Sequence, residues 1–308
     1  MDKKRLLITG GSGSIGRTFI ERYYNSYLFY NISRNEFFQT ELKREFPFVT
    51  NYIGSIEDIG FLYNVFEQVK PDIVLHTAAM KNIATGEENP IQLCKTNIIG
   101  SLNVIDASLR SDVSMTIGIS TDKACLPGNN YGYTKSLMEK CFMMANTKRN
   151  KFAICRFANV AKSSSSVIPF WLKLKMERKA LKLTDKRMNR LMFSKTDAVE
   201  FIHKTFELCS KLGGGFIGVN IKMKTVNMYD LAKSISNDIE VIGKISDAEK
   251  YDEDLVSERE VERTHILNDR YVMIMPDRKH WLNNMSCEFG SHNAEKMTAE
   301  EMRKLVEE

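Results

Sequence analysis

The chain has 308 residues, of which 43% are hydrophobic and 27% are charged, and its formal net charge is +5. These values are ordinary for a soluble globular protein, and no apolar run approaches the roughly 18 residues of a membrane-spanning helix, so we expect no membrane insertion. The six cysteines and five histidines are scattered without metal-ligand spacing, which predicts reduced thiols, a cytoplasmic location and no metal site.

A glycine-rich turn lies near the start of the chain, between a predicted strand, Leu6–Ile8, and a predicted helix, Arg17–Tyr24. In this context the first glycine allows a tight bend, the second lets a pyrophosphate approach the backbone, and the third lets the helix pack close to the strand. The alternative is a plain loop of glycine and serine. We interpret the turn as a dinucleotide-binding motif. The predicted contacts come from Thr9, Gly10, Gly13, Ser14, Ile15 and Gly16.

The next predicted strand, Tyr27–Ile32, ends in Ser33 and Arg34. Proteins that bind a free ribose 2′-hydroxyl usually place an acidic residue about 20 residues beyond the glycines. A hydroxyl and a guanidinium suit a 2′-phosphate instead. We therefore expect NADP rather than NAD as the cofactor, with Ser33 and Arg34 at its ribose. The alternative is that Arg34 is a solvated loop residue.

Strands and helices alternate through the first half of the chain. The further predicted strands are Phe48–Ile53, Ile73–His76, Met115–Ile119 and Phe152–Phe157, and the predicted helices are Asn35–Phe46, Ile59–Val69 and Pro90 to about Ser111. Small residues at Thr77–Ala79 let the backbone lie against a flat cofactor ring. The alternation predicts an α/β fold with a Rossmann-type, doubly wound parallel sheet.

Polar residues end the strand Met115–Ile119 and lead through a Pro-Gly-Asn-Asn turn into a helix that starts near Tyr131. Tyr131 and Lys135 are four residues apart, so they lie on one face of that helix. A tyrosine hydroxyl normally has a pKa of about 10, and a cation beside it favours the phenolate, which allows proton exchange near neutral pH. The same spacing also occurs by chance on helix surfaces.

The regular alternation fades after about Ala158, and we expect a smaller, mixed region that binds substrate. Residues 1–160 would form the NADP-binding domain, with contributions from about 190–225, and residues 161–308 would form mainly the substrate-binding region. The predicted elements are a loop at Ser163–Ser166, helices at Lys173–Lys182, Asp197–Leu208 and Asn227–Ile235, a strand at Phe216–Ile221, polar helix and loop at Asp247–Arg263, and a last helix opened by a capping box at Thr298–Glu301. The cations of Lys173–Lys182 suit a solvated face, and nucleic-acid binding is the alternative.

Several separated stretches match the motifs of one family, in the same order along the chain. They are Thr9–Gly16; Ser33–Glu36; Ala78–Lys81 with Glu87, Asn89 and Pro90; Thr96–Ile98 with Gly100; Ser120–Lys135; Arg156–Val160; Ser166–Pro169; Thr184 and Asp185 with Met188 and Arg190; and Glu249 and Lys250. On these stretches the chain resembles the extended short-chain dehydrogenase/reductases that act on nucleotide sugars. Within them it is similar to the UDP-N-acetylglucosamine 4,6-dehydratases of the CapD-like polysaccharide-biosynthesis group.

This resemblance implies that the sugar is oxidised and reduced within one turnover. Tyr131 would take the C4 hydroxyl proton, Thr121 would hydrogen-bond the C4 oxygen, and Lys135 would lower the pKa of Tyr131 and bind the cofactor ribose. Once C4 is a ketone, Lys123 would remove the C5 proton and Asp122 would protonate the departing C6 hydroxyl. The alternative for Asp122 and Lys123 is a surface ion pair. Inverting members have tyrosine at the position of Tyr131, which implies inversion at C5.

The resemblance also implies contacts on both sides of the site. Further cofactor contacts would come from Ala78, Ala79, Lys81, Asn97, Tyr131 and Lys135. The substrate contacts would come from Lys81 near the sugar, Asn159 and Arg190 near the diphosphate, Val167 near uracil and Glu249 near the uridine ribose. The chain departs from the family pattern at Ser55, which lacks the carboxylate expected at adenine, at Ala158 in place of glycine, and at Ala248–Glu253 in place of Gly-Glu-Lys-Leu-His-Glu.

Family members are usually homo-oligomers, so we expect a homo-oligomer that takes a UDP-sugar and binds no nucleic acid. The main alternative is a UDP-N-acetylglucosamine 4-epimerase, which shares the cofactor and the Tyr131 and Lys135 pair but needs no acid–base pair for C6. A second alternative is a non-catalytic NADP-binding regulator. Such regulators typically lose the tyrosine or the lysine, and this chain keeps both.

Overall fold

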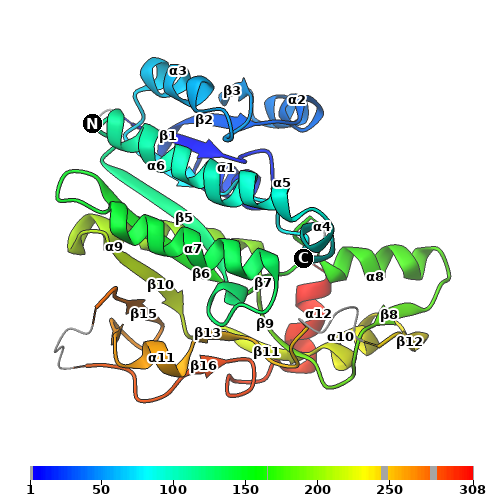
Figure 1. The fold of residues 1–308 in the computed structure, drawn as a ribbon. Coiled ribbons are helices and arrows are strands. Elements are labelled where there is room, and N and C mark those ends of the chain that lie inside the picture. Colours follow the sequence, from blue (N-terminus) through cyan, green and yellow to red (C-terminus); the bar gives the residue numbers. More distant parts are fainter. Residues whose placement is uncertain (1–2, 165, 244–248, 278–282, 308) are drawn as a thin grey trace.

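A sheet of nine strands runs through the centre of the molecule in the computed structural model, which describes residues 3–164, 166–243, 249–277 and 283–307 (Figure 1). Its strands are β1 (Lys4–Thr9), β2 (Tyr27–Ser33), β3 (Thr50–Ile53), β4 (Ile73–His76), β5 (Met115–Thr121), β6 (Lys151–Phe157), β10 (Phe216–Asn220), β14 (Thr264–Ile266) and β15 (Tyr271–Ile274). They lie in the order β14-β15-β10-β6-β5-β4-β1-β2-β3. The strands from β3 to β10 are parallel, and β15 and β14 add to one edge antiparallel. The predicted doubly wound parallel sheet is confirmed.

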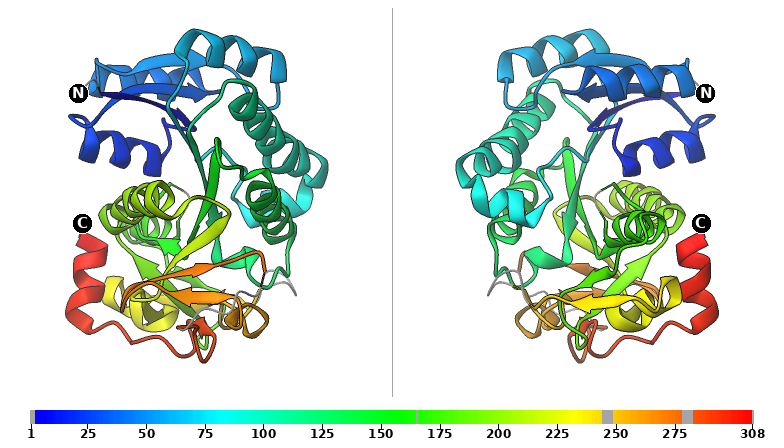
Figure 2. Two further views of the ribbon diagram at one scale, coloured as in Figure 1. Left: turned by 90° about the vertical axis from the view of Figure 1, so that its left-hand side faces the viewer. Right: turned by 90° about the vertical axis from the view of Figure 1, so that its right-hand side faces the viewer.

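Helices cover both faces of the sheet (Figure 2). The helices α1 (Ser14–Tyr23) and α9 (Lys195–Leu212) pack together on one face, the helices α3 (Ile59–Val69), α6 (Gly100–Arg110) and α7 (Asn130–Ala145) cover the other, and α2 (Glu36–Glu45) lies beside β3. Successive side chains of β1 point to opposite faces, so Leu6 joins the core that contains Phe19 of α1, whereas Leu7 joins the core that contains Phe66 of α3. The apolar run of β1 is buried because both faces are covered.

The predicted helix from Pro90 to Ser111 is interrupted by a π turn. It consists of α5 (Pro90–Cys94), the π turn η1 (Lys95–Ile99) and α6, and the shorter helix α4 (Ile83–Glu88) precedes it without having been predicted. A π turn inserts one residue into a helix without breaking it, so the apolar periodicity still indicates one long helix. The turn brings the consecutive residues Thr96 and Asn97 into the interior, where each is at most 2% exposed.

Part of the second region surrounds a further core, which contains the fully buried Trp171. Its strands are β7 (Asn159–Val160), β9 (Asn189–Phe193) and β11 (Lys224–Asn227) in one sheet, β8 (Leu181–Leu183) with β12 (Ile239–Val241), and β13 (Asp254–Val256) with β16 (Phe289–Gly290). Its helices are α8 (Val167–Met176), α10 (Met228–Ile235), α11 (Glu258–Val261) and α12 (Ala299–Glu307). The predicted capping box is present before α12, since Thr298 and Glu301 bond reciprocally.

The predicted helix Lys173–Lys182 is wrong in its bounds, because α8 begins earlier, at Val167, and ends at Met176. Lys182 belongs to β8, and its ammonium pairs with Glu240, while Lys179 pairs with Glu177. These pairs support the interpretation of a solvated face. In the segment predicted as polar helix and loop, residues 247 and 248 lie outside the described residues, and β13 was not predicted.

The division of the chain at residue 160 stays a prediction. The sheet itself takes β10, β14 and β15 from the second half of the sequence, so the two halves share one core. Among the described residues, no helix is long and apolar enough to cross a bilayer.

Candidate active site

A cavity of about 810 Å³ lies at the carboxyl ends of the parallel strands. Its walls include residues that follow β1, β2, β4, β5 and β6, and the second region contributes the wall opposite. The chain proceeds from β1 to β2 and β3 on one side and then to β4, β5 and β6 on the other, so the cavity lies at the point where the strand order reverses. Open α/β sheets bind ligands at such a point.

The glycine-rich turn has the shape that a dinucleotide requires. Gly10 has φ +77°, a conformation that favours glycine, and a Cβ at Gly16 would lie 2.4 Å from the Cα of Gly11. The helix α1 begins at Ser14, and its N-cap residue Gly13 supplies no side-chain hydrogen bond, so the first N–H groups are left for a ligand such as phosphate. Gly13, Ser14 and Ile15 line the cavity. The turn therefore fits the pyrophosphate of a nicotinamide dinucleotide.

Ser33 and Arg34 also line the cavity, at the end of β2. The hydroxyl of Ser12 donates to Ser33 Oγ at 3.0 Å, which holds the serine beside the glycine turn. Arg34 is more than half exposed, and its Nη1 lies 3.4 Å from Glu57 Oε1. The structure therefore brings the hydroxyl of Ser33 and the guanidinium of Arg34 to the end of the cavity that holds the glycine turn. The carboxylate of Glu57 lies beside the guanidinium.

Ala78, Ala79 and Lys81 line the cavity as predicted, whereas three other residues predicted to contact the cofactor lie behind its wall. Those three are Thr9, Gly16 and Asn97. The amide of Asn97 accepts from Met80 N at 2.8 Å, and its Nδ2 donates to Met80 O at 2.9 Å. Asn97 therefore shapes the loop after β4 that forms the wall.

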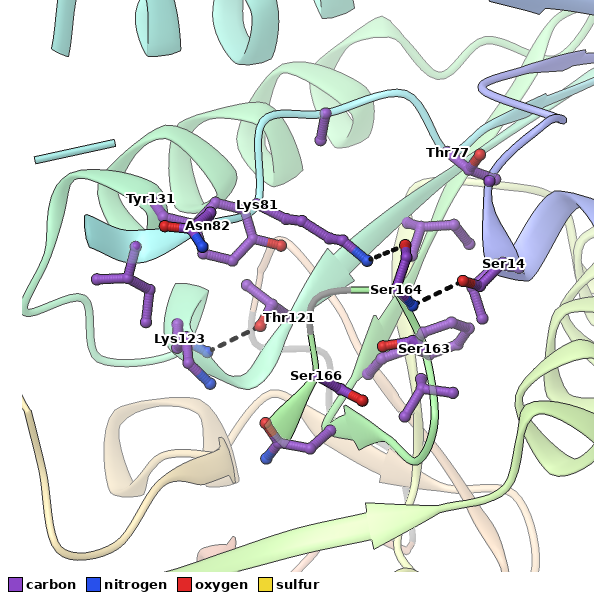
Figure 3. A pocket seen from close by; sticks show the side chains of 18 of the residues that line it. Ser14, Thr77, Lys81, Asn82, Thr121, Lys123, Tyr131, Ser163, Ser164 and Ser166 are labelled. Atoms are coloured by element: carbon purple, nitrogen blue, oxygen red, sulfur yellow. Dashed lines mark hydrogen bonds between the residues drawn. The ribbon is translucent and has the colours of Figure 1, made fainter. Parts of the chain in front are cut away.

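Ser164 joins three parts of the site (Figure 3). Lys81 Nζ donates to Ser164 Oγ at 3.2 Å, and Ser164 N donates to Ser14 Oγ at 2.8 Å. The loop that leads into the second region is thus bonded to the glycine turn and to the loop after β4.

Thr121 ends β5, Asp122 and Lys123 lie in the 3₁₀ turn η2 (Asp122–Ala124), and all three line the cavity. Figure 3 shows Thr121 and Lys123 at this place. Asp122 is 1% exposed, and its Oδ1 accepts from Thr121 Oγ1 at 2.7 Å and from Lys123 Nζ at 3.0 Å. Burial opposes the charge of Asp122, but Lys123 and these hydrogen bonds outweigh it and lower its pKa. Asp122 and Lys123 are therefore a buried ion pair of the cavity and not a surface pair.

Tyr131 and Lys135 lie in the first two turns of α7 and both line the cavity. Burial raises the pKa of Tyr131, as does the nearby carboxylate of Asp122, while Thr121 opposes the rise. Burial lowers the pKa of Lys135 to about 7, and its Nζ lies 3.1 Å from Met138 Sδ. The effect of Lys135 on the pKa of Tyr131, which the resemblance implies, stays a prediction, and in the structure burial and the carboxylate of Asp122 act on Tyr131 in the opposite direction.

The buried guanidinium of Arg156 joins α7 to the second region. It forms bidentate pairs with Glu139, one turn beyond Lys135, and with Glu260 of α11, all at 2.7–2.9 Å. Arg156 is 1% exposed, and it also donates to the carbonyl of Leu255. The sequence analysis matched Arg156 to a family motif but did not identify its partners, which are 17 and 104 residues away in the chain.

The four residues predicted on the far side of the cavity all line it, namely Asn159, Val167, Arg190 and Glu249. The guanidinium of Arg190 is fixed by backbone carbonyls, since Nη1 donates to Tyr251 O and Nη2 to Lys250 O, each at 3.0 Å. Its charge faces the cavity and contributes to the lowered pKa of Asp122. Sequence analysis missed Glu253, which also lines this wall and is 5% exposed. Within the described parts of the chain, His, Cys, Asp and Glu form no group that could hold a metal ion.

Comparison with known sequences places this arrangement among enzymes of sugar nucleotides. A family model for polysaccharide biosynthesis proteins matches residues 6–275. A UDP-N-acetylglucosamine 4,6-dehydratase (inverting) of Campylobacter jejuni is 37% identical over 286 residues, which cover 88% of this chain and 83% of the relative. A UDP-glucose 4-epimerase of Rickettsia massiliae is 30% identical, and the match covers 98% of this chain and 95% of the relative.

Solved structures share the fold over most or nearly all of the chain. Pen from Bacillus thuringiensis has a TM-score of 0.90 at 28% identity, and the match covers 99% of this chain and 97% of that one. WbmG from Bordetella bronchiseptica, in complex with NAD and UDP, has a TM-score of 0.65 at 20% identity and covers 80% of this chain and 83% of its own. At that identity the second likeness concerns the fold alone.

Proposed function

The chain belongs to the polysaccharide biosynthesis protein family, and we propose that it is a lyase that removes water across C5 and C6 of UDP-N-acetylglucosamine. The observation that carries this proposal is the buried pair of Asp122 and Lys123 in the same cavity as Tyr131 and Lys135. Elimination needs acid–base groups at C5 and C6, whereas epimerisation at C4 needs only the tyrosine and a cofactor. The higher identity to the dehydratase than to the epimerase, 37% against 30%, agrees with this choice.

Each residue of the site has one chemical role in the proposed reaction. A bound nicotinamide would accept hydride from C4 and return hydride to C6, so that the cofactor is unchanged after each turnover. Tyr131 accepts the C4 hydroxyl proton, and Thr121 holds the C4 oxygen. The ketone at C4 makes the C5 proton acidic, and Lys123 removes it. The hydride transfer gives no net oxidation or reduction, so the product differs from the substrate only by the loss of one water.

We propose NADP as the cofactor, because Ser33 and Arg34 lie where the ribose 2′-position would be. Replacing Arg34 with alanine should weaken NADPH binding about 10-fold and leave NADH binding unchanged, because one charge-assisted contact to the 2′-phosphate is lost. Fluorescence titration of the two reduced cofactors measures this. Arg44→Ala is the control, since Arg44 is exposed on α2 and pairs with Glu41. Tighter binding of NADH than NADPH by the unaltered protein would contradict the assignment.

One incubation separates the dehydratase from the epimerase. With UDP-N-acetylglucosamine the protein should give a product lighter by one water, and in deuterated water the early product should gain one mass unit at C5, because Lys123 exchanges that proton. Mass spectrometry measures both quantities. A product of unchanged mass without deuterium would instead favour the UDP-N-acetylglucosamine 4-epimerase, and no product at all would favour a non-catalytic regulator. We propose inversion at C5 on account of Tyr131, which proton NMR of the product would report.

We also propose a homo-oligomer that associates through α6 and α7. Large apolar side chains are exposed on this surface, including Leu102 at 40%, Tyr133 at 58%, Leu137 at 45% and Met144 at 85%. Side chains at positions 133, 137 and 144 share one face of α7. Leu137→Glu should shift the protein toward monomer in sedimentation velocity, because it places a charge in the apolar contact. Met176→Glu, at the exposed end of α8, should leave the assembly unchanged.

Several assignments from the sequence stay predictions. They are the diphosphate contacts of Asn159 and Arg190, the uracil contact of Val167, the ribose contact of Glu249, the sugar contact of Lys81, the cytoplasmic location and a role in a surface polysaccharide or other glycan. The position of the first five residues on the cavity wall supports the contacts proposed for them.

A further inference from the structure

The guanidinium proposed to meet the cofactor already has a carboxylate beside it, and that carboxylate comes from a different part of the sheet. Arg34 follows β2, whereas Glu57 lies in the loop between β3 and α3. The Nη1 atom of Arg34 lies 3.4 Å from Glu57 Oε1, and the two side chains are 56% and 24% exposed. Among the described residues this is the one ion pair of Arg34. The ends of two neighbouring strands therefore bring opposite charges together at the glycine-turn end of the cavity.

Glu57 is held in place independently of Arg34. Its Oε1 accepts from Thr96 Oγ1 at 2.7 Å, and Gln92 Nε2 donates to Oε1 at 2.9 Å and to Oε2 at 3.1 Å. Its backbone carbonyl accepts from Asn103 Nδ2 at 3.1 Å. These three donors belong to α5, the π turn and α6. The carboxylate therefore stays fixed and hydrogen-bonded when the guanidinium turns away.

Arg34, by contrast, can exchange its partner at small cost. Its side chain lines the cavity and is more than half exposed, and ion pairs this exposed contribute little to stability. A phosphate monoester carries a charge of about −1.5 to −2 near pH 7 and binds a guanidinium through two parallel N–H bonds, so it is the stronger acceptor. A free 2′-hydroxyl is neutral and does not displace the carboxylate.

We propose that Glu57 is a specificity-determining residue, which competes with the 2′-phosphate of NADP for Arg34 and thereby limits the preference for NADP over NAD. This inference rests on the proposed cofactor. NADP must take the guanidinium from Glu57, and the carboxylate that stays behind is a fixed anion, which repels the like charge of the phosphate. NAD brings no phosphate to this place, so neither effect changes its affinity.

Glu57→Gln tests the competition, because glutamine keeps the length of the side chain and an oxygen for Thr96 but carries no charge. Fluorescence titration should show NADPH bound about 3- to 5-fold more tightly, the upper range for an exposed ion pair, and NADH bound as before. Glu57→Ala, which removes the carboxylate altogether, should shift the NADPH affinity in the same direction. The matched control is Glu41→Gln, since Glu41 pairs with Arg44 at 2.7 Å on α2 and does not line the cavity. That variant should leave both affinities unchanged.

The same change in a protein without Arg34 shows whether Glu57 acts through that residue. In the Arg34→Ala background, Glu57→Gln should change the NADPH affinity by less than about 2-fold, because no guanidinium is left to compete for. An equal gain in both backgrounds would overturn the inference, and so would NADPH binding that neither Glu57→Gln nor Glu57→Ala tightens. If the unaltered protein prefers NADH, or if Arg34→Ala alone leaves NADPH binding unchanged, the proposed cofactor is wrong and the role of Glu57 is removed with it.

Discussion

Tyr131→Phe should abolish the loss of water from UDP-N-acetylglucosamine, with a fall in turnover of about 10³-fold or more. Tyr131 carries the only phenol that lines the cavity among the described residues, and it stands beside Thr121 and Asp122. In the proposed mechanism Tyr131 accepts the C4 proton, so without its hydroxyl the ketone on which elimination depends would not be formed. Steady-state release of the 4-keto product, followed by mass spectrometry, measures the effect.

The matched control is Tyr133→Phe, two residues further along α7, where the side chain is 58% exposed and does not line the cavity. That variant should keep the unaltered rate. NADPH titration of Tyr131→Phe should give an unchanged affinity, because the phenol contributes a proton acceptor and little binding. Turnover by Tyr131→Phe within a few-fold of the unaltered protein would remove Tyr131 from the mechanism.

Arg156→Met should destabilise the fold by about 3–5 kcal/mol, the cost of leaving buried charges without their partner. Arg156 is 1% exposed and binds the carboxylates of both Glu139 and Glu260. Methionine has a similar length but no charge, so Glu139 would lose its salt-bridge partner and Glu260 would keep the longer pair with Arg263, at 3.2 Å. Urea unfolding gives the free energy of unfolding. Arg149→Met, which breaks an exposed pair with Asp112, should change the midpoint little.

If Arg156→Met unfolds with the same free energy as the unaltered protein, the network of Arg156, Glu139 and Glu260 makes no net contribution to stability. A triple replacement of Arg156, Glu139 and Glu260 by apolar residues should recover most of the loss, because buried ion networks and well-packed apolar groups are often of equal stability.

Acid unfolding checks the same network independently. Burial opposes the charge of Glu260, but Arg156 and the surrounding hydrogen bonds lower its pKa to about 2 from the ordinary 4.5. Between these values the unfolded chain binds more protons at this site than the folded chain, so stability rises with pH. The contribution of Glu260 is complete above pH 4.5 and is lost as the pH falls toward 2. As the pH falls from 4.5 toward 2, the free energy of unfolding of Arg156→Met should therefore fall less steeply than that of the unaltered protein.

The sheet and the centre of the site could be predicted because their signals are local in the sequence. The strand, glycine turn and helix around Gly10 are contiguous, and Ser120–Lys135 places Thr121, Lys123 and Tyr131 within one strand, one turn and one helix start. Residues this close in sequence have few ways to be arranged once their elements are assigned.

What the sequence could not show depends on residues far apart in the chain or on burial. Arg156 meets Glu260 across 104 residues, and Glu253 of the second region lines the same cavity as Asp122. The direction of the pKa change at Tyr131 follows from burial, which no spacing reveals. The strands β7 and β9 escaped prediction because two to five residues give no reliable alternation.

The π turn at Lys95–Ile99 makes the helix from Pro90 to Arg110 sensitive to the loss of one residue, a change that substitutions do not test. Because the turn absorbs one extra residue, losing one residue there would restore regular α-helical winding while α6 kept its face toward the sheet. The loss would fall on the residues inside the turn, and Asn97 would lose its two hydrogen bonds to Met80. A homologue shortened by one residue at this place would need another way to hold the loop after β4, but it could keep the outward face of α6.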